Sequence, residues 1–170
     1  SGQDWLEERT GKPVLGVIPY LHNLQLDAED SIDTAQVEKD EHPLQVVIPV
    51  PPRISNHTDF DALRLHPQVQ LHYIGQDDTP PPADLLILPD SNNLREDLMW
   101  LLDNGCHEVI LRHLRYGGRV LGICGGMQML GNSIDDWAGI ESDPGDSAGL
   151  WLLNLDTTLL PGKELRQASG

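Results

Sequence analysis

The sequence predicts an α/β fold, with a mainly parallel sheet flanked by helices, on three observations. Short apolar runs of strand length alternate with segments of helical periodicity. The chain of 170 residues is long enough for one domain with a sizeable core. Its composition, 39% apolar and 22% charged, is that of an ordinary globular domain.

Five segments carry a strand pattern. LQVVIPV at 44–50 is a continuous apolar run rich in β-branched residues, as expected of a strand buried on both faces. ADLLILP at 83–89 has the same character, and QLHYIG at 70–75 is shorter and weaker. RVLGIC at 119–124 is a further strand, which leads directly into GGMQMLG. The apolar run PVLGVIPYL at 13–21 predicts one further strand, which leads into a loop.

Helical patterns fill the intervals between the later strands. A short helix, capped by Ser55 or Thr58, is expected after the strand at 44–50. A longer helix lies in 90–105 and ends at Gly105. Its apolar stripe has the spacing i, i+4, i+7 and i+8 and consists of Leu94, Leu98, Leu101 and Leu102. A second helix follows in 107–118, and its inward side chains are expected to be Ile110, Leu111 and Leu114.

Composition divides the chain into three parts. Residues 1–26 are expected to be the end of a preceding domain, and 44–170 the α/β domain. Between them, 27–43 carries seven acidic residues against one lysine, which predicts a solvated acidic linker. Beyond Gly131 the pattern is loop-like until 149–160, where GLWLLNLDTTLL predicts one more strand.

Charge and cysteine content limit the partners. The net charge of −16 argues against binding nucleic acid or an anionic membrane surface, because like charges repel. No apolar run approaches the roughly 20 residues that cross a bilayer. The two cysteines lack CxxC spacing, so we expect free thiols and a cytoplasmic location. No clustering of residues points to a metal site.

Cys124 is the candidate catalytic residue. It follows an apolar strand and stands in the pattern G-x-C-x-G with Gly122 and Gly126, the thiol form of a strand–turn–helix nucleophile elbow. Such a site is expected at the carboxyl edge of a parallel sheet. A helix starting at Gly125 would direct its free N–H groups at the sulfur, lower the thiol pKa and stabilise an oxyanion.

The alternative for a lone cysteine is a small core residue, since free cysteine is among the most buried residue types. Glycines after a strand also occur in ordinary turns. Cys106 lacks any such setting and is expected to be structural.

Several stretches resemble one enzyme family in order along the chain. GICGGMQMLG resembles the nucleophile segment of class I, triad-type glutamine amidotransferases, a flavodoxin-like fold. More narrowly, the chain is similar to the glutaminase domain of the cobyric acid synthase family from about Lys12 to Leu160. The matching stretches are KPVLGVIPYLHNLQLDAEDS, PRISNHTDFDAL, LPDSNNLREDLMWL and GLWLLNLDTT.

The resemblance implies a two-part enzyme in which this domain releases ammonia from glutamine. An amino-terminal synthetase domain would bind ATP, Mg and a corrinoid and activate peripheral carboxylates for amidation. By position, Cys124 would form a glutamyl thioester. Gly125 would supply one oxyanion-hole N–H, the turn at Asp90 a second, and Gln128 would help to hold the substrate.

The chain departs from the family pattern in the turn before the long helix. The family usually has a P-G-S-K-like turn where this chain has Pro-Asp-Ser-Asn, with Asp90 for glycine and Asn92 for lysine. A left-handed backbone at Asp90 would carry a cost, and its carboxylate would raise the pKa of a neighbouring thiol. Asn92 would act only as a helix cap.

The base and the ATP site of the family are not found in these residues. The resemblance implies a histidine well beyond Cys124, after a G-Y-E-I-H-like segment that this sequence lacks. Its histidines all precede Cys124, and we expect them to be surface or loop residues: His22, His42, His57, His66, His72, His107 and His113. No GxxxxGK[ST] phosphate loop is present. The chain is therefore expected to be an internal piece, incomplete at its C-terminus.

Three other functions remain open from the sequence. One is a related corrinoid amidotransferase, the a,c-diamide synthase, although PRISNHTDFDAL favours the first family. Another is a non-catalytic docking module with a buried Cys124. The third is a thiol-protease-like or redox member of the fold group, whose elbow would normally carry histidine where Met127 stands.

Overall fold

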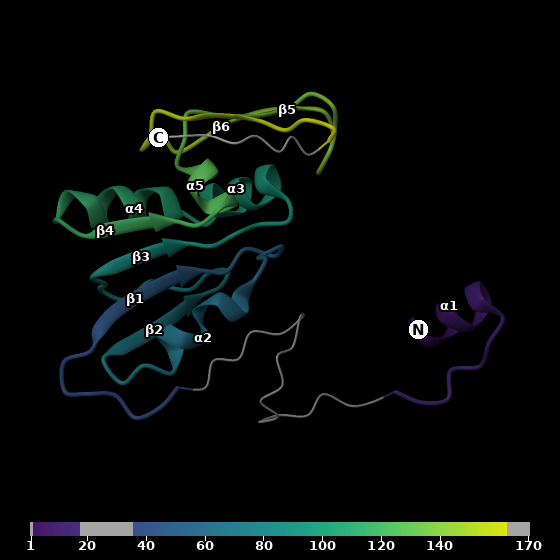
Figure 1. Ribbon diagram of the computed structural model, residues 1–170, viewed down its shortest axis with the longest axis horizontal. Coiled ribbons are helices and arrows are strands. Elements are labelled where there is room, and N and C mark those ends of the chain that lie inside the picture. The colour runs from purple at the N-terminus through teal and green to yellow at the C-terminus, as the bar shows by residue number, and fades with distance from the viewer. Residues whose placement is uncertain (1, 18–35, 163–170) are drawn as a thin grey trace.

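A four-stranded parallel sheet forms the centre of the computed structural model, which describes residues 2–17 and 36–162 (Figure 1). Its strand order is β2-β1-β3-β4, and every pairing is parallel. The strands are β1 (Leu44–Pro49), β2 (Val69–Ile74), β3 (Leu85–Leu88) and β4 (Arg119–Gly122). The predicted α/β class is confirmed, and so are the four strands predicted between residues 44 and 124.

Helices lie on both faces of this sheet. The helices of the described residues are α1 (Gly2–Thr10), which lies against neither face (Figure 1), the 3₁₀ helix η1 (His57–Phe60), α2 (Asp61–Arg64), α3 (Leu94–Asp103), α4 (Cys106–Arg115) and α5 (Gly125–Met129). On one face, η1 and α2 cover β1 and β2. On the other, α3, α4 and α5 lie against β3 and β4 (Figure 1).

Alternation along the strands supplies a core to each face. Leu86 and Leu88 pack with the α3–α5 layer, whereas Ile87 packs with the opposite layer, because successive side chains of a strand point to opposite faces. The first core also holds the α3 residues Leu94, Leu98 and Leu101. The prediction of burial on both faces is therefore confirmed for β1 and β3, whereas the edge strand β4 has no buried residue.

The apolar stripes of two helices are narrower than predicted. Leu102 is 40% exposed, so the stripe of α3 stops at Leu101. In α4 only Cys106 and Ile110, one turn apart, are buried. The expectation that Leu111 and Leu114 point inward is wrong, since they are 42% and 37% exposed. Leu111 lies about 100° around the helix from Ile110.

A second small sheet follows α5, where the sequence predicts mostly loop. It has the order β6-β5-β7. Its strands are β5 (Ser133–Asp136), β6 (Gly145–Ala148) and β7 (Asp156–Thr158). β6 is antiparallel and β7 parallel to β5. The strand predicted within 149–160 is thus confirmed only for the three residues of β7, and β5 and β6 were not predicted because they carry no apolar alternation.

The segments before β1 differ from their prediction. α1 was not predicted, has no buried residue and lies apart from both sheets in Figure 1. Residues 13–17 of the strand predicted at 13–21 form no strand, and Leu15 and Val17 are exposed. The rest of that prediction, 18–21, lies outside the described residues.

The described end of the predicted linker packs on the sheet. The Gln36 side chain accepts from the Leu71 N–H at 3.0 Å and donates to the Leu71 carbonyl at 2.8 Å. Lys39 Nζ donates to the carbonyls of Arg64 and His66. This segment therefore covers the edge strand β2. Residues 27–35 of the linker lie outside the described part, and the domain boundary at 43 stays a prediction.

Candidate active site

Three loops meet at the carboxyl edge of the parallel sheet, as predicted for the site. The loop after β1 and the turn after β3 are joined by backbone hydrogen bonds, from the Ser55 N–H to the Asp90 carbonyl and from the Asn92 N–H to the Arg53 carbonyl, both at 3.0 Å. The turn after β4 carries Cys124. Its neighbour Ile123 donates to the Leu88 carbonyl at 3.0 Å. The cysteine turn is thus held against the end of β3.

Cys124 has the backbone of a nucleophile elbow. Its φ of 48° and ψ of −109° place it in a region that L-residues rarely adopt. The residue is exposed, whereas Cys106 is buried in the core, as predicted. The strained turn therefore presents the thiol of Cys124 to solvent at the start of α5.

The flanking glycines of the motif are required by close backbone contacts. A Cβ at Gly126 would lie 2.1 Å from the carbonyl oxygen of Leu88, and one at Gly122 would lie 2.5 Å from the Cα of Met127. Real Cβ atoms do not approach backbone atoms so closely. The absence of side chains at these positions therefore allows the sharp turn and its close packing on β3.

Two backbone N–H groups converge beside Cys124. Gly125, the residue after the cysteine, donates to Asp90 Oδ1 at 3.1 Å. Ser91 donates to the same oxygen at 2.8 Å. Two donors directed at one oxygen at these distances have the geometry of an oxyanion hole. Gly125 is a predicted donor, and the second donor shown here is Ser91, one residue after the predicted Asp90. A backbone donor leaves no side-chain signal in a sequence.

The Asp90 carboxylate sits in the middle of this arrangement. Its second oxygen accepts from Asn56 Nδ2 at 3.2 Å, and the carboxylate also interacts with the Cys124 thiol. Partial burial raises the pKa of Asp90, but these hydrogen bonds outweigh burial and hold its pKa below the ordinary value. Asp90 does not have a positive φ, so the backbone cost considered from the sequence does not arise.

The pKa of Cys124 is raised, which corrects the prediction that the helix would lower it. The largest cause is the hydrogen bond to Asp90, followed by desolvation and the negative charges of Asp90 and Glu141. The Gly125 N–H acts in the opposite direction but is outweighed. The prediction that a carboxylate at position 90 would raise the thiol pKa is confirmed.

A buried carboxylate holds the turn that carries Ser91. Asp97 in α3 is fully buried and accepts from Ser91 Oγ at 2.7 Å and from the Arg53 N–H at 3.3 Å. Burial raises the pKa of Asp97, although both of these hydrogen bonds oppose that rise. Asp97 therefore joins α3 to two of the three loops, a role that the sequence did not indicate.

The structure also places the remaining residues that the sequence analysis singled out. Gln128 is half-buried in α5, one turn after Cys124. The cap of α3 is Asn93, whose side chain accepts from the Glu96 N–H, and not Asn92. His57 is buried in η1, which corrects its assignment as a surface or loop residue. His22 lies outside the described residues.

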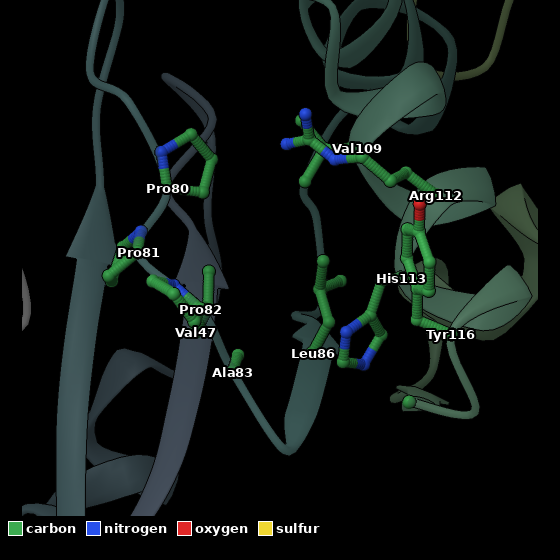
Figure 2. Close-up of a pocket in the computed structure, with 11 residues that line it drawn as sticks. Val47, Pro80, Pro81, Pro82, Ala83, Leu86, Val109, Arg112, His113 and Tyr116 are labelled. Atoms are coloured by element: carbon green, nitrogen blue, oxygen red, sulfur yellow. The ribbon is translucent and has the colours of Figure 1, made fainter.

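Figure 2 shows a pocket of about 350 Å³, whose lining includes no residue of the cysteine turn. It is enclosed by the proline run before β3, the helix α4 and the sheet. The lining residues are Val47, Pro80, Pro81, Pro82, Ala83, Leu86, Val109, Arg112, His113, Tyr116 and Gly118. Ala83 and Gly118 precede β3 and β4, so this pocket opens toward the amino ends of these strands, opposite the cysteine edge.

Within residues 2–17 and 36–162, no three or more histidine, cysteine or carboxylate side chains are grouped so that they could hold a metal ion. Across the same part of the chain, no helix has the length and apolar character needed to span a bilayer.

Comparison of the chain with models of protein families shows to which family it belongs. Residues 45–170 match the model of the CobB/CobQ-like glutamine amidotransferase domain. The chain belongs to this glutamine amidotransferase family. The match contains the parallel sheet, the cysteine turn and both converging N–H groups. The predicted relationship to class I glutamine amidotransferases is therefore confirmed at the level of the domain.

Among solved structures, the amidotransferase chain is similar to a chain in the structure of PurLQS from Thermotoga maritima. The two are 21% identical, with a TM-score of 0.42, over 57% of this chain and 50% of that chain. The matched part thus spans half the length of that chain.

Proposed function

We propose that residues 44–170 are the glutaminase portion of a cobyric acid synthase. In this proposal it supplies ammonia from glutamine for the ATP-dependent amidation of peripheral carboxylates of cobyrinic acid a,c-diamide, in cytoplasmic cobalamin biosynthesis. Residues 1–26 would then end the synthetase domain, which would bind ATP, Mg and the corrinoid, and 27–43 would contribute the linker.

One observation carries the glutaminase part of the proposal. An exposed thiol in a strained turn lies beside two backbone N–H groups that converge on one oxygen. Cys124 would attack the side-chain amide carbon of glutamine as a thiolate. The Gly125 and Ser91 N–H groups would receive the negative charge that develops on the amide oxygen. Ammonia would leave with a proton, and water would then hydrolyse the glutamyl thioester.

The corrinoid part of the proposal is supported by the ordered resemblance along the chain, above all by RISNHTDFDAL at 53–63. The closest alternative is a,c-diamide synthase. A carboxylate-acceptor assay on the complete gene product separates the two. Amidation of cobyrinic acid a,c-diamide is expected, and amidation that stops at the a and c carboxylates of cobyrinic acid would favour the alternative.

A glutamine-analogue electrophile tests the nucleophile. Incubation of the chain with diazo-oxo-norleucine is expected to label Cys124 and to leave the buried Cys106 unlabelled, as peptide mass spectrometry would show. Cys124→Ser is the matched control and should remove the label. Equal inertness of both cysteines would instead favour a docking module without catalysis.

Ammonia release tests whether these 170 residues contain the general base. We expect the 170-residue chain to hydrolyse glutamine at a small fraction of the rate of a complete enzyme, because general-base catalysis typically contributes about 10²–10⁴-fold. A rate near that of the complete gene product would show that a base is present within these residues.

A further inference from the structure

We propose that the Asp90 side chain is an internal plug of the oxyanion hole, which closes the Cys124 site until the carboxylate is displaced. The inference rests on the proposed function, in which Cys124 is the nucleophile and the N–H groups of Gly125 and Ser91 form the hole. It adds an autoinhibitory contact that is built into the fold.

The plug occupies the position that the reaction needs. Asp90 Oδ1 lies 3.1 Å from the Gly125 nitrogen and 2.8 Å from the Ser91 nitrogen. These distances are those expected between such donors and the oxyanion of a tetrahedral intermediate. Two negatively charged oxygens cannot share one position. A substrate carbonyl can therefore enter the hole only when the Asp90 side chain has left it.

A second loop holds the plug in place. Asn56 Nδ2 donates to Asp90 Oδ2 at 3.2 Å, from a left-handed backbone with a φ of 51° that asparagine tolerates better than most residues. The backbone of the same loop is joined to the Asp90 carbonyl through the Ser55 N–H. The carboxylate is thus held at both oxygens, by groups from three loops.

The same carboxylate also keeps the nucleophile protonated. The Cys124 thiol hydrogen-bonds to Asp90, and a nearby negative charge opposes formation of the thiolate. Withdrawal of this one side chain would free both N–H donors and remove the main obstacle to thiol ionisation. A free oxyanion hole and an ionised thiol, both of which the attack on glutamine requires, would therefore arise together.

Two probes separate the two effects of the plug. Iodoacetamide alkylates a thiolate by displacement of iodide and needs no oxyanion hole. With p-nitrophenyl acetate, the Cys124 thiolate attacks the carbonyl carbon, a C–S bond forms, p-nitrophenolate leaves, and the thiol proton passes to the buffer. This second reaction develops an oxyanion. Both rates are measured at Cys124 on the 170-residue chain, and the buried Cys106 serves as the unreactive control.

Asp90→Gly is expected to accelerate both reactions and to raise the ratio of acylation to alkylation about tenfold or more, since one oxyanion donor is commonly worth about 10²–10³ in rate. Asp90→Asn removes the charge but keeps an oxygen in place. It should accelerate alkylation and leave the ratio within about twofold of the wild-type value. Asp103→Asn, an exposed carboxylate at the end of α3, is the matched control and should change neither rate.

An unchanged ratio in Asp90→Gly would overturn the plug, whether or not the alkylation rate rises, while reaction of Cys124 would still support it as the nucleophile. A Cys124 that fails to react with the ester in Asp90→Gly, in a variant whose circular dichroism matches the wild type, would overturn both the plug and the nucleophile. The two failures are therefore distinguishable.

Discussion

Gly126 illustrates how a single missing Cβ shapes the cysteine turn. A methyl group there would overlap the Leu88 carbonyl oxygen, at 2.1 Å. We expect Gly126→Ala to lower the free energy of unfolding by about 3 kcal/mol, because backbone must move to relieve the overlap. Urea denaturation measures this. Gly16→Ala, with nothing within 4 Å of the new methyl group, is the control and should stay within about 0.5 kcal/mol.

The ionisation of Cys124 gives a second prediction at this scale. Asp90 and Glu141 disfavour the thiolate, so the pH at which alkylation reaches half its maximal rate should lie above the value of about 8.5 for an ordinary cysteine. Asp90 has the larger effect of the two carboxylates, so removing its charge favours deprotonation of the Cys124 thiol. Asp90→Asn should therefore move this midpoint to lower pH.

Glu141→Gln provides the comparison for this profile. Glu141 is the smaller of the two negative influences on Cys124, and its carboxylate also accepts from the Leu94 N–H at 2.7 Å. Its substitution should lower the midpoint by less than Asp90→Asn does. A midpoint that Asp90→Asn leaves unchanged would contradict the role of Asp90 in holding the thiol protonated.

The helix α3 combines packing with support of the site. Leu98 is fully buried in the core, while the adjacent Met99 is 55% exposed. Leu98→Ala should lower the free energy of unfolding by about 3 kcal/mol, through lost burial and a cavity. Met99→Ala should cost less than about 0.5 kcal/mol. Comparable losses in thermal or urea denaturation would show that α3 is oriented differently.

Asp97 connects the packing of α3 to the positions of two loops at the site. From the buried face of α3 it accepts hydrogen bonds from both Ser91 and Arg53, which belong to two of the loops at the site. The position of the Ser91 N–H therefore depends on how α3 packs, and not only on the local sequence of the turn.

At the scale of the whole molecule, the second sheet is tied to α3 by Arg95. The guanidinium donates to the Asp143 carbonyl at 2.6 Å and to the hydroxyls of Ser142 and Ser147. We expect Arg95→Ala to speed amide hydrogen exchange in β5 and β6 by at least about tenfold, because the loss of a single hydrogen bond to a charged group already corresponds to about 1.5–3 kcal/mol. Exchange in β1 and β3 should not change.

Arg115→Ala, an exposed arginine at the end of α4, is the matched control for this exchange measurement. It should leave both sheets as protected as in the wild type. If Arg95→Ala also speeds exchange in β1 and β3 to the same extent, the two sheets open as one unit, and the expectation of independent opening is wrong.

The sequence by itself determined the strands of the parallel sheet, the cysteine turn and the position of Cys124 at the carboxyl edge. Each depends on local information: apolar runs of strand length and the two glycines beside Cys124. That a carboxylate at position 90 would raise the thiol pKa was expected from the family resemblance, which places the turn at Asp90 beside the cysteine; the hydrogen bond that contributes most to this rise was not expected.

Only the tertiary structure decided the strands β5 and β6, the second N–H donor at the site and the direction in which the pKa of Cys124 shifts. The small strands β5 and β6 lack apolar alternation and exist through pairing with each other and contacts to α3. Ser91 became a candidate donor because its N–H group converges with that of Gly125, and any residue type supplies an N–H. The raised pKa of Cys124 results from a hydrogen bond across two loops, which outweighs the local effect of the Gly125 N–H. Contacts between distant segments, and not the residues themselves, set the state of the thiol.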